Sequence, residues 1–298
     1  MSTLAELSDA IAAVVKTAEE SVVRVEARRR LPATGLVWSE DGIIVTANHV
    51  VQKDDNIKVG LADGTTVPAT LVGRDPSTDL AILKIDQTGL KPFVEVDKTS
   101  LGVGNLVLAL GRPGKTVQAT MGILSAYGGS WRTHTGGQID HYLQTDLVMY
   151  PGFSGGPLVN AEGQLVGFNS SSLMRGVSLA VPTSTIARIA DSLMTHGHVK
   201  KGYLGVSTQQ VRLPETAQED LKQKRGLLVV SVETGSAADK GGLTLGDTIV
   251  GVEGATVQNH DDLLAQLRGD RIGKKVSLKI LRGGKSKKVS VKVGERSS

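Results

Sequence analysis

The sequence predicts a mainly β protein with two successive domains. Its 298 residues are 40% hydrophobic and 21% charged, which is an ordinary globular composition, and the chain is about twice as long as a typical single domain. Aromatic residues make up only 3%, while glycine reaches 36 residues. A chain rich in Val, Leu and Ile with many glycine breaks suits short strands joined by tight turns. We therefore expect one β domain of roughly 200 residues and a second of roughly 100.

The first domain is expected to span residues 1–199. Residues 4–19 have apolar side chains at helical spacing, which predicts an amphipathic helix that packs on the body of the domain. From Val22 the pattern changes to short apolar runs cut by turn residues, enough for two consecutive six-stranded barrels. A second helix is expected from Ser184 to about Gly197, where glycine ends the helical pattern.

The second domain is expected to span residues 200–298. A new β pattern follows a short basic link, and a helix begins at Asn259, which is a good N-cap with Asp262 three residues later. The last strands form a hairpin around residues 283–284, because two adjacent glycines suit the positive φ values of a tight turn. The pattern indicates one β-rich module with one helix.

Composition and spacing exclude several kinds of site. The chain has no cysteine, so a thiolate nucleophile, a thiolate metal site and a disulfide are all excluded. His196 and His198 lie two residues apart, which fits no zinc motif, and we expect neither a metal nor any other cofactor. The run ALGRPGKT resembles a phosphate loop, but Ala109 stands in place of its first glycine, so nucleotide binding is rejected.

The charge balance does not favour a nucleic-acid partner. Lys and Arg number 34 against 30 Asp and Glu, which gives a formal net charge of +4. Much of this surplus lies between Lys274 and Lys292, and a small basic surplus is typical of a solvated face. We expect no binding to nucleic acid.

The N-terminal residues give an expectation about location. They lack a basic start and carry acidic residues, unlike a secretory signal. The apolar run from Ala10 to Val15 is too short to cross a membrane. We therefore expect no membrane span and a cytoplasmic location. The alternative, if an export segment was removed, is a periplasmic or other extracytoplasmic location.

The strongest pattern of reactive side chains places His49, Asp79 and Ser154 in the segments TANHVV, DPSTDLAIL and PGFSGGPLVN. Their order along the chain is that of the chymotrypsin-type triad and not of the subtilisin or α/β-hydrolase arrangements. A serine hydroxyl is a poor nucleophile until an adjacent imidazole takes its proton. We expect His49 to act first as base and then as acid, and Asp79 to stay ionised and hold the imidazole.

Glycines surround the expected nucleophile. They let the backbone turn tightly, so that the N–H groups of Gly152 and Ser154 converge on a developing oxyanion. Losing one such donor costs roughly 3–4 kcal/mol of transition-state stabilisation. Each residue alone has an ordinary structural explanation, such as a surface histidine or a turn aspartate. The ordered combination indicates a serine hydrolase.

These segments, together with DLAILKI, QTD and KKGYLGV, resemble the HtrA (high-temperature-requirement) protease family from about Ser21 to the end of the chain. The resemblance implies a chymotrypsin/trypsin-like double β-barrel followed by one PDZ domain. It also implies a serine endopeptidase that hydrolyses misfolded or unstructured proteins through an acyl-enzyme, without metal or ATP. Members of this family typically assemble as trimers or larger oligomers, so a homotrimer is the expected assembly.

Among the departures from the family pattern, Phe153 and the specificity loop bear on the active site. Phe153 precedes the nucleophile where the family usually has a polar Asn, and a bulky apolar side chain there would alter how the oxyanion loop is held. The specificity loop implied by the resemblance carries Ser178, Leu179 and Ala180, which predicts an uncharged S1 pocket for small or medium aliphatic side chains. The alternative that Phe153 leaves open is a peptide-binding or chaperone-like protein with weak protease activity.

The second domain contains a match to the carboxylate-binding loop of PDZ modules, Tyr203, Leu204, Gly205 and Val206. Successive N–H groups of such a loop cradle a peptide carboxylate while the peptide adds as a strand. His260 and Leu264 on the following helix would form part of the opposite wall of this groove. We expect it to bind peptide C-termini that end in a hydrophobic residue. A scaffold that uses only the PDZ groove is a third reading.

Overall fold

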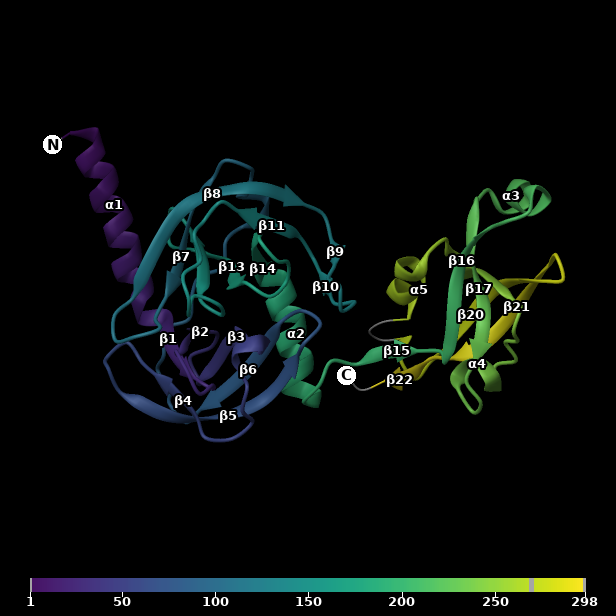
Figure 1. Cartoon of the computed structure of the whole chain (residues 1–298), viewed down its shortest axis with the longest axis horizontal. Helices are drawn as coiled ribbons and strands as arrows, with labels where there is room; N and C mark the ends of the chain where they lie inside the picture. The colour runs from purple at the N-terminus through teal and green to yellow at the C-terminus, as the bar shows by residue number, and fades with distance from the viewer. Residues whose placement is uncertain (1, 268–270, 297–298) are drawn as a thin grey trace. The chain divides into compact units, whose positions relative to one another are not determined.

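Strands hold 41% of the residues and helices 20%, so the expectation of a mainly β fold is confirmed. The computed structural model describes residues 2–267 and 271–296 (Figure 1). The chain divides into two units, Met1–Val199 and Lys200–Ser298. Each unit encloses its own hydrophobic core.

The first barrel closes in the order β1-β2-β3-β6-β5-β4, and its strand pairs are antiparallel. Its strands are β1 (Val22–Glu26), β2 (Ala33–Val37), β3 (Ile43–Ala47), β4 (Ile57–Gly60), β5 (Thr66–Asp75) and β6 (Leu80–Ile85). β2 and β3 are buried at every position, whereas β5 has many partly exposed positions. Because both of their faces are buried, β2 and β3 lie in the interior of the unit.

The second barrel closes in the order β11-β14-β13-β12-β7-β8. Its strands are β7 (Leu106–Gly111), β8 (Gln118–Gly128), β11 (Tyr142–Thr145), β12 (Pro157–Asn160), β13 (Leu165–Ser170) and β14 (Ser178–Pro182). A short hairpin of β9 (Trp131–Arg132) and β10 (Gln138–Ile139) lies between β8 and β11 in the sequence. The prediction of two consecutive six-stranded barrels is therefore confirmed.

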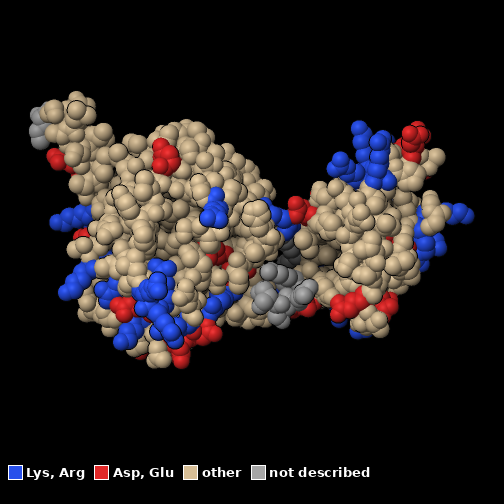
Figure 2. Space-filling model, in the orientation of Figure 1, with Lys and Arg blue, Asp and Glu red and all other residues tan. Residues whose placement is uncertain are grey.

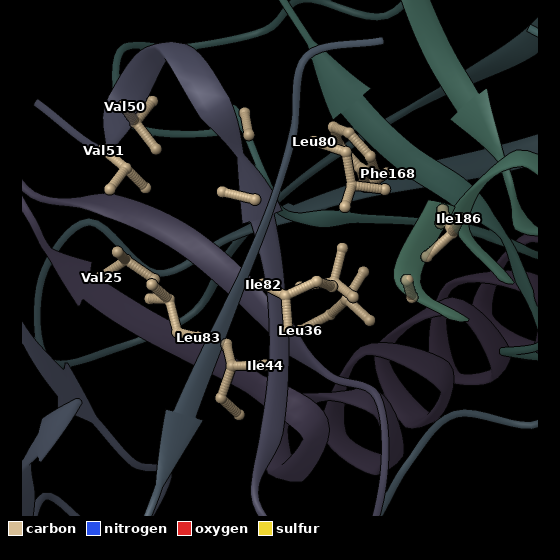
Figure 3. Packing of buried hydrophobic residues seen from close by; sticks show 14 of the residues in the cluster. Val25, Leu36, Ile44, Val50, Val51, Leu80, Ile82, Leu83, Phe168 and Ile186 are labelled. Carbon is tan, nitrogen blue, oxygen red and sulfur yellow. The ribbon is translucent and has the colours of Figure 1, made fainter. Parts of the chain in front are cut away.

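One hydrophobic cluster joins the two barrels. It contains residues of the first barrel, such as Leu36 and Ile82, and also Phe168 of β13 and Ile186. Figure 3 shows Phe168 and Ile186 beside the side chains of the first barrel. Burying large apolar side chains contributes about 1.5–3 kcal/mol each. The barrels are thus held together by the same packing that stabilises the first of them.

Two long helices flank the barrels. Helix α1 (Thr3–Ala18) begins and ends one residue before the expected range, and its apolar face packs through Ile11, Val14 and Val15 on a small cluster of both barrels. Helix α2 (Thr183–His196) buries its apolar stripe and ends at Gly197, whose φ of 73° is left-handed. Glycine adopts this conformation without steric cost, which explains why it ends the helix. The 3₁₀ turns are η1 (Glu19–Ser21), η2 (Asn48–Val50) and η3 (Lys98–Ser100).

The second unit is built on a sheet in the order β16-β17-β18-β20-β21, with β19 paired to β18. Its strands are β15 (Lys201–Tyr203), β16 (Val206–Arg212), β17 (Arg225–Val232), β18 (Thr248–Val252), β19 (Ala255–Thr256), β20 (Lys275–Arg282), β21 (Lys285–Lys292) and β22 (Gly294–Arg296). Its helices are α3 (Glu215–Leu221), α4 (Ala237–Lys240) and α5 (His260–Gln266). The sequence predicted α5 from its N-cap pattern, although that helix has only 7 residues. Helices α3 and α4, of 7 and 4 residues, are too short to show a period and were not predicted.

Charged side chains of both signs share the surface. Figure 2 shows blue Lys and Arg side chains over the first barrel with red Asp and Glu side chains among them. Pairs such as Lys91 with Glu20, at 3.0 Å, are more than half exposed on both sides. Exposed pairs of this kind contribute about 0–1 kcal/mol. The fold therefore depends on its apolar packing and its strand ladders.

Helix α5 begins with a complete capping box. The Asn259 side chain accepts a hydrogen bond from Asp262 N–H at 2.9 Å, and the Asp262 carboxylate accepts one from Asn259 N–H at 3.2 Å. Both bonds satisfy N–H groups that the helix itself leaves unpaired.

Replacing Asn259 with Ala should destabilise α5 by about 1 kcal/mol, because an N-cap acceptor is lost. Hydrogen exchange of α5 amides, followed by mass spectrometry, should be several-fold faster in Asn259→Ala than in the parent chain. Asn259→Asp keeps an oxygen acceptor and should exchange like the parent. Equal exchange in the Ala and Asp variants would contradict a capping role.

Candidate active site

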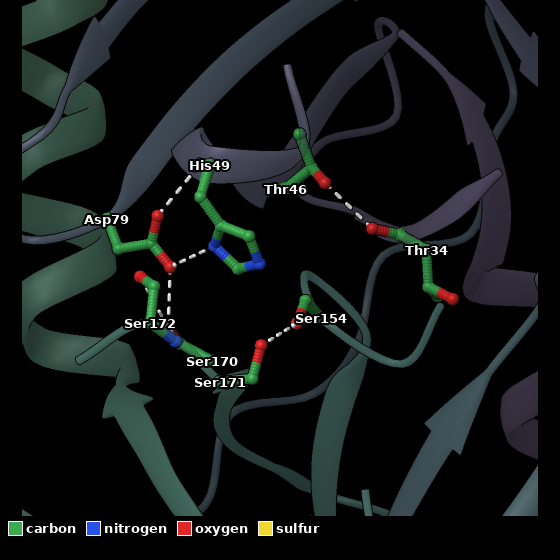
Figure 4. A network of polar contacts seen from close by, with 8 residues as sticks. All are labelled: Thr34, Thr46, His49, Asp79, Ser154, Ser170, Ser171 and Ser172. Carbon is green, nitrogen blue, oxygen red and sulfur yellow. Dashed lines mark hydrogen bonds and ion pairs between the residues drawn. The ribbon is translucent and has the colours of Figure 1, made fainter. Parts of the chain in front are cut away.

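The three predicted triad residues come from both barrels and meet in one place (Figure 4). His49 lies in the turn η2 directly after β3, and Asp79 directly precedes β6. Ser154 lies in the segment between β11 and β12 of the second barrel. β3 and β6 are paired, with Ala47 opposite Leu80, so the ladder of the first barrel brings His49 and Asp79 together.

His49 and Asp79 are joined by two hydrogen bonds. The distance from His49 Nδ1 to Asp79 Oδ2 is 2.8 Å, and His49 N–H donates to Asp79 Oδ1 at 2.9 Å. Asn48 N–H also donates to the Asp79 carbonyl at 2.9 Å. Because Nδ1 faces the carboxylate, the imidazole presents Nε2 on the side away from it. This is the orientation that a general base for serine requires.

The backbone of Asp79 has a left-handed conformation with φ of 59°. A non-glycine residue in this region bears a cost of about 1 kcal/mol, although Asp tolerates it better than most. Three bonds from Asn48 and His49 hold it there. The strained position aims the carboxylate at the imidazole, as strained residues at functional sites commonly do.

The Asp79 carboxylate is almost fully buried and has one more partner. Burial by itself opposes ionisation, but hydrogen bonds and charge attraction from His49 and a hydrogen bond from the Ser170 hydroxyl outweigh it, so the pKa of Asp79 is lowered. The carboxylate is therefore ionised at neutral pH, as the sequence analysis expected. Ser170 was missed, since nothing in the run of serines from 170 to 172 indicates which one faces the first barrel.

The Ser154 hydroxyl forms a hydrogen bond with another serine. Its Oγ lies 3.0 Å from Ser171 Oγ, and no hydrogen bond joins it to His49 among the described residues. Figure 4 shows the His49 ring between Asp79 and Ser154. Bonds between catalytic groups are often long without substrate and tighten when it binds. Rotation of the Ser154 side chain would exchange Ser171 for the imidazole.

The segment around Ser154 requires its glycines. A Cβ on Gly155 would lie 2.2 Å from the Thr34 carbonyl oxygen, closer than atoms can approach, and its φ is 86°. Gly152 likewise has a φ of 94°. Within residues 2–267 and 271–296, the N–H groups of Gly152 and Ser154 have no hydrogen-bond partner. These two donors, the ones predicted for an oxyanion hole, are available to a ligand.

Phe153 is fully buried in the core of the second barrel. Its ring packs directly on Gly111, where a Cβ would lie 2.5 Å from Phe153 Cδ1, and meets the Tyr150 ring edge-on at 5.8 Å. An anchored aromatic ring restrains the backbone on either side of it. Phe153, which stands where a polar Asn was expected, therefore fixes the nucleophile segment to the barrel.

The expected specificity residues lie in β14. Leu179 and Ala180 are 1% and 2% exposed and belong to the hydrophobic clusters of the unit. The Ser178 hydroxyl donates to the Leu147 carbonyl at 2.8 Å. Ser178 is thus the member of this group that is partly exposed, and its bond ties β14 to the segment that leads to Ser154.

The expected carboxylate loop lies between β15 and β16 of the second unit. Leu204 is buried in the core, and its carbonyl accepts a bond from Ala238 N–H. Gly205 has a φ of 82°, and a Cβ there would lie 2.2 Å from Ser236 Cβ. The N–H groups of Leu204 and Gly205 have no acceptor in the described part of the chain. Tyr203 ends β15 and Val206 begins β16.

Helix α5, the predicted groove wall, contacts β16 through His260. His260 Nε2 lies 2.9 Å from both the hydroxyl and the carbonyl oxygen of Thr208 in β16. Leu264 is 39% exposed, while its neighbour Leu263 is buried. β16 is an edge strand of its sheet, and an edge strand can pair with an added peptide.

Comparison with known proteins gives the family. A model of the trypsin-like peptidase domain matches residues 33–168, and a model of the PDZ domain matches residues 202–293. A solved structure described as HtrA-type protease AlgW with tripeptide is 34% identical, with a TM-score of 0.79 over 96% of this chain and 97% of that one. The chain belongs to the HtrA family of serine proteases. A serine endoprotease from Yersinia pestis is 30% identical, with a TM-score of 0.79 over 96% of this chain and 98% of that one.

Curated relatives are longer than this HtrA chain. A protein of Pseudomonas putida named as a probable periplasmic serine endoprotease, DegP-like, is 38% identical over 267 residues, which are 88% of this chain and 55% of the relative. A Halomonas elongata protein of the same name is 37% identical over 90% of this chain and 57% of its own length. The chain thus spans somewhat more than half the length of these relatives.

The expected cytoplasmic location is wrong. The relatives of this HtrA chain are named periplasmic. The first residues form the amphipathic helix α1 and pack on the barrels, so their composition reports packing and not location. No helix in the described residues has the length and apolar character needed to cross a membrane.

Truncating Phe153 should test its role as an anchor. Phe153→Ala removes a fully buried ring and should lower the free energy of unfolding by about 3–5 kcal/mol, whereas Phe153→Leu should cost less than half as much. Urea unfolding followed by tryptophan fluorescence reports this unit, because Trp38 and Trp131 both lie in it. A loss below about 1 kcal/mol in Phe153→Ala would show that the ring does not hold the segment.

Proposed function

We propose that this chain is a serine endopeptidase that hydrolyses peptide bonds in unfolded or misfolded proteins through an acyl-enzyme. The observation that carries the proposal is the pair of bonds between His49 and Asp79, with Ser154 on the open side of the imidazole (Figure 4). Membership of the HtrA family supports it. His49, Asp79 and Ser154 are the catalytic residues, and no step needs a metal or another cofactor.

The first chemical step begins at the Ser154 hydroxyl. The hydroxyl leaves Ser171, donates to His49 Nε2 and transfers its proton there as Oγ attacks the substrate carbonyl carbon. The carbonyl oxygen becomes an oxyanion that accepts hydrogen bonds from the N–H groups of Gly152 and Ser154. His49 then gives the proton to the leaving amine, which departs and leaves an acyl group on Ser154.

The second step repeats the first with water. His49 takes a proton from the water, whose oxygen attacks the acyl carbon, and returns that proton to Ser154 Oγ as the ester bond breaks. Each imidazolium formed is opposed by the ionised Asp79 carboxylate, whose lowered pKa keeps it charged. The two bonds from His49 to Asp79 preserve the ring orientation throughout.

The substrate is an extended polypeptide. We place small or medium aliphatic side chains in an uncharged S1 pocket bordered by β14, where Ser178 tethers the wall to Leu147. The PDZ groove between β16 and α5 binds C-termini that end in a hydrophobic residue, with the carboxylate at Leu204 and Gly205. Two solved relatives are described as complexes with a decapeptide and a tripeptide.

We also propose a periplasmic homotrimer. The names of the curated relatives support the location. The family supports the assembly, and the two exposed leucines near the start of α1, Leu4 and Leu7, offer apolar surface for it.

A second candidate is a peptide-binding or chaperone-like protein with weak protease activity. The observation that favours it is the bond from Ser154 to Ser171, because a nucleophile held there is not activated by His49. A fluorophosphonate probe separates the candidates. Labelling of the parent chain but not of Ser154→Ala supports the peptidase, and absence of labelling supports the second candidate.

Cleavage of an unfolded protein tests the proposal directly. The parent chain should degrade casein, and Ser154→Ala should not, because removing the nucleophile of a triad costs about 10⁶-fold in kcat. A peptide with a hydrophobic C-terminus, added to both, should raise the rate of the parent only. Degradation by Ser154→Ala at the parent's rate would point to a contaminating protease and overturn the assignment.

Binding at the PDZ groove is tested by Gly205→Ala. A Cβ there would meet Ser236 and force a left-handed alanine, so affinity for a fluorescent peptide with a hydrophobic C-terminus should fall at least about tenfold. Gly254→Ala is the matched control, since Gly254 also has a positive φ, of 81°, but open space around its Cβ. Equal peptide affinity of the two variants, measured by fluorescence polarisation, would place the carboxylate elsewhere.

A further inference from the structure

Thr34 of β2 is a fully buried polar residue in contact with the nucleophile segment. Its hydroxyl lies 2.7 Å from the Gly152 carbonyl oxygen and 2.8 Å from the Arg112 N–H. Its own N–H donates to the Ser154 carbonyl at 3.3 Å. One residue of the first barrel therefore contacts both Gly152 and Ser154 of the second.

The direction of these bonds follows from the groups present. Arg112 N–H can only donate, so the Thr34 oxygen accepts from it. The single proton of the hydroxyl is then free to point at the Gly152 carbonyl, which can only accept. In this one orientation the hydroxyl both accepts a hydrogen bond and donates one. An apolar side chain of the same shape would leave the Gly152 carbonyl and the Arg112 N–H without their partner.

The two carbonyls that Thr34 holds belong to the residues whose N–H groups face the oxyanion. A peptide group is planar, so the Gly152 carbonyl shares its plane with the Phe153 N–H, and the Ser154 carbonyl shares its plane with the Gly155 N–H. Holding the two carbonyls therefore restrains the backbone directly after each of the two donor residues. Gly152 lacks a Cβ and has a φ of 94°, so by itself it would rotate freely. The Phe153 ring, buried in the barrel core, fixes the residue between them. With these three restraints, the N–H groups of Gly152 and Ser154 are aimed before substrate arrives.

Thr34 is itself held from the far side. Its carbonyl accepts a bond from the Thr46 hydroxyl at 2.7 Å, and Thr46 lies in β3, three residues before His49. Figure 4 shows the bond from Thr46 to Thr34. The bond from the Thr34 hydroxyl to the Gly152 carbonyl continues this chain of contacts to the loop that carries the nucleophile. Pre-aimed donors of this kind lower the barrier because they need no reorganisation during the reaction.

We propose that the Thr34 hydroxyl is a positioning residue for the oxyanion hole, acting through the Gly152 carbonyl. Thr34 touches no substrate and takes no part in proton transfer. This inference rests on the proposed peptidase function. It assigns to one buried hydroxyl, through its bond to the Gly152 carbonyl, the task of keeping the Gly152 donor aligned with the Ser154 donor.

The test compares Thr34→Val, which keeps the shape and removes the hydroxyl, with Thr34→Ser, which keeps the hydroxyl. With a peptide substrate, Thr34→Val should lower kcat about 10- to 100-fold, less than the loss of a whole oxyanion donor, with KM changed less than about threefold. Binding of a peptide boronic acid, which places an oxygen in the hole, should weaken in parallel. Thr34→Ser should recover kcat to within about threefold.

Thr185→Val is the matched control for loss of a buried hydroxyl. Thr185 is also fully buried, and its hydroxyl accepts a hydrogen bond from Asp140 N–H at 2.9 Å, on helix α2 and away from the nucleophile segment. It should lower thermal stability to a similar degree but leave kcat and boronic acid affinity unchanged. An equal loss of kcat in Thr185→Val and Thr34→Val would make the effect one of stability alone and overturn the proposal.

A readout without turnover separates this proposal from the peptidase assignment. Hydrogen exchange of residues 150–156, measured by mass spectrometry, should be at least about threefold faster in Thr34→Val than in the parent, Thr34→Ser and Thr185→Val. Unchanged exchange in Thr34→Val overturns the positioning role whether or not the chain is active. Faster exchange in Thr34→Val, together with a parent chain that resists the fluorophosphonate probe, would keep the positioning role and reject the peptidase.

Discussion

The backbone of the nucleophile segment packs directly against strand β2, and the rest of the site depends on that contact. Gly155 faces the Thr34 carbonyl with no room for a Cβ. A Cβ on Gly156 would lie 2.9 Å from Thr34 Cγ2 and 2.1 Å from the Leu110 carbonyl oxygen of β7. β2 is paired with β3, which leads to His49. The distance between base and nucleophile is therefore governed by one strand ladder and by two residues that lack side chains.

Opposing electrostatic effects meet at Asp79. A buried carboxylate loses its hydration, which favours the neutral form. Bonds from His49 and Ser170 reverse that preference and keep the group ionised. The left-handed backbone of Asp79 is the local cost of reaching this position. The outcome is a fixed negative charge beside the imidazole, shielded from water and held by partners from both barrels.

The parts that sequence predicts are those coded by local pattern or by an ordered motif. Both barrels follow from short apolar runs, α5 from its capping box, and the pairing of His49 with Asp79 from segments in characteristic order. Ser170, Ser171 and Thr34 were not predicted, because each acts on a residue far away in the chain. The bond from Ser170 to Asp79, for example, joins positions 91 residues apart.

Phe153 shows that a family motif does not predict where a side chain is buried. The residue departs from the family pattern, but the structure buries its ring in the core of the second barrel. A side chain's direction depends on the cavity that surrounding strands leave, and here Gly111 leaves room for a ring. The predicted cytoplasmic location was wrong for a related reason. The composition of a helix records what it packs against, and says little about where the molecule works.

Because the two barrels share one hydrophobic cluster, the activity of the site depends on the whole unit staying folded. Leu36 and Ile82 on one side and Phe168 and Ile186 on the other belong to a single core, so one barrel cannot come away without exposing the apolar surface of both. His49 and Asp79 would then part from Ser154 in the same event. A molecule whose barrels separate therefore loses its active site in the same step in which it begins to resemble the unfolded chains that it is proposed to cut.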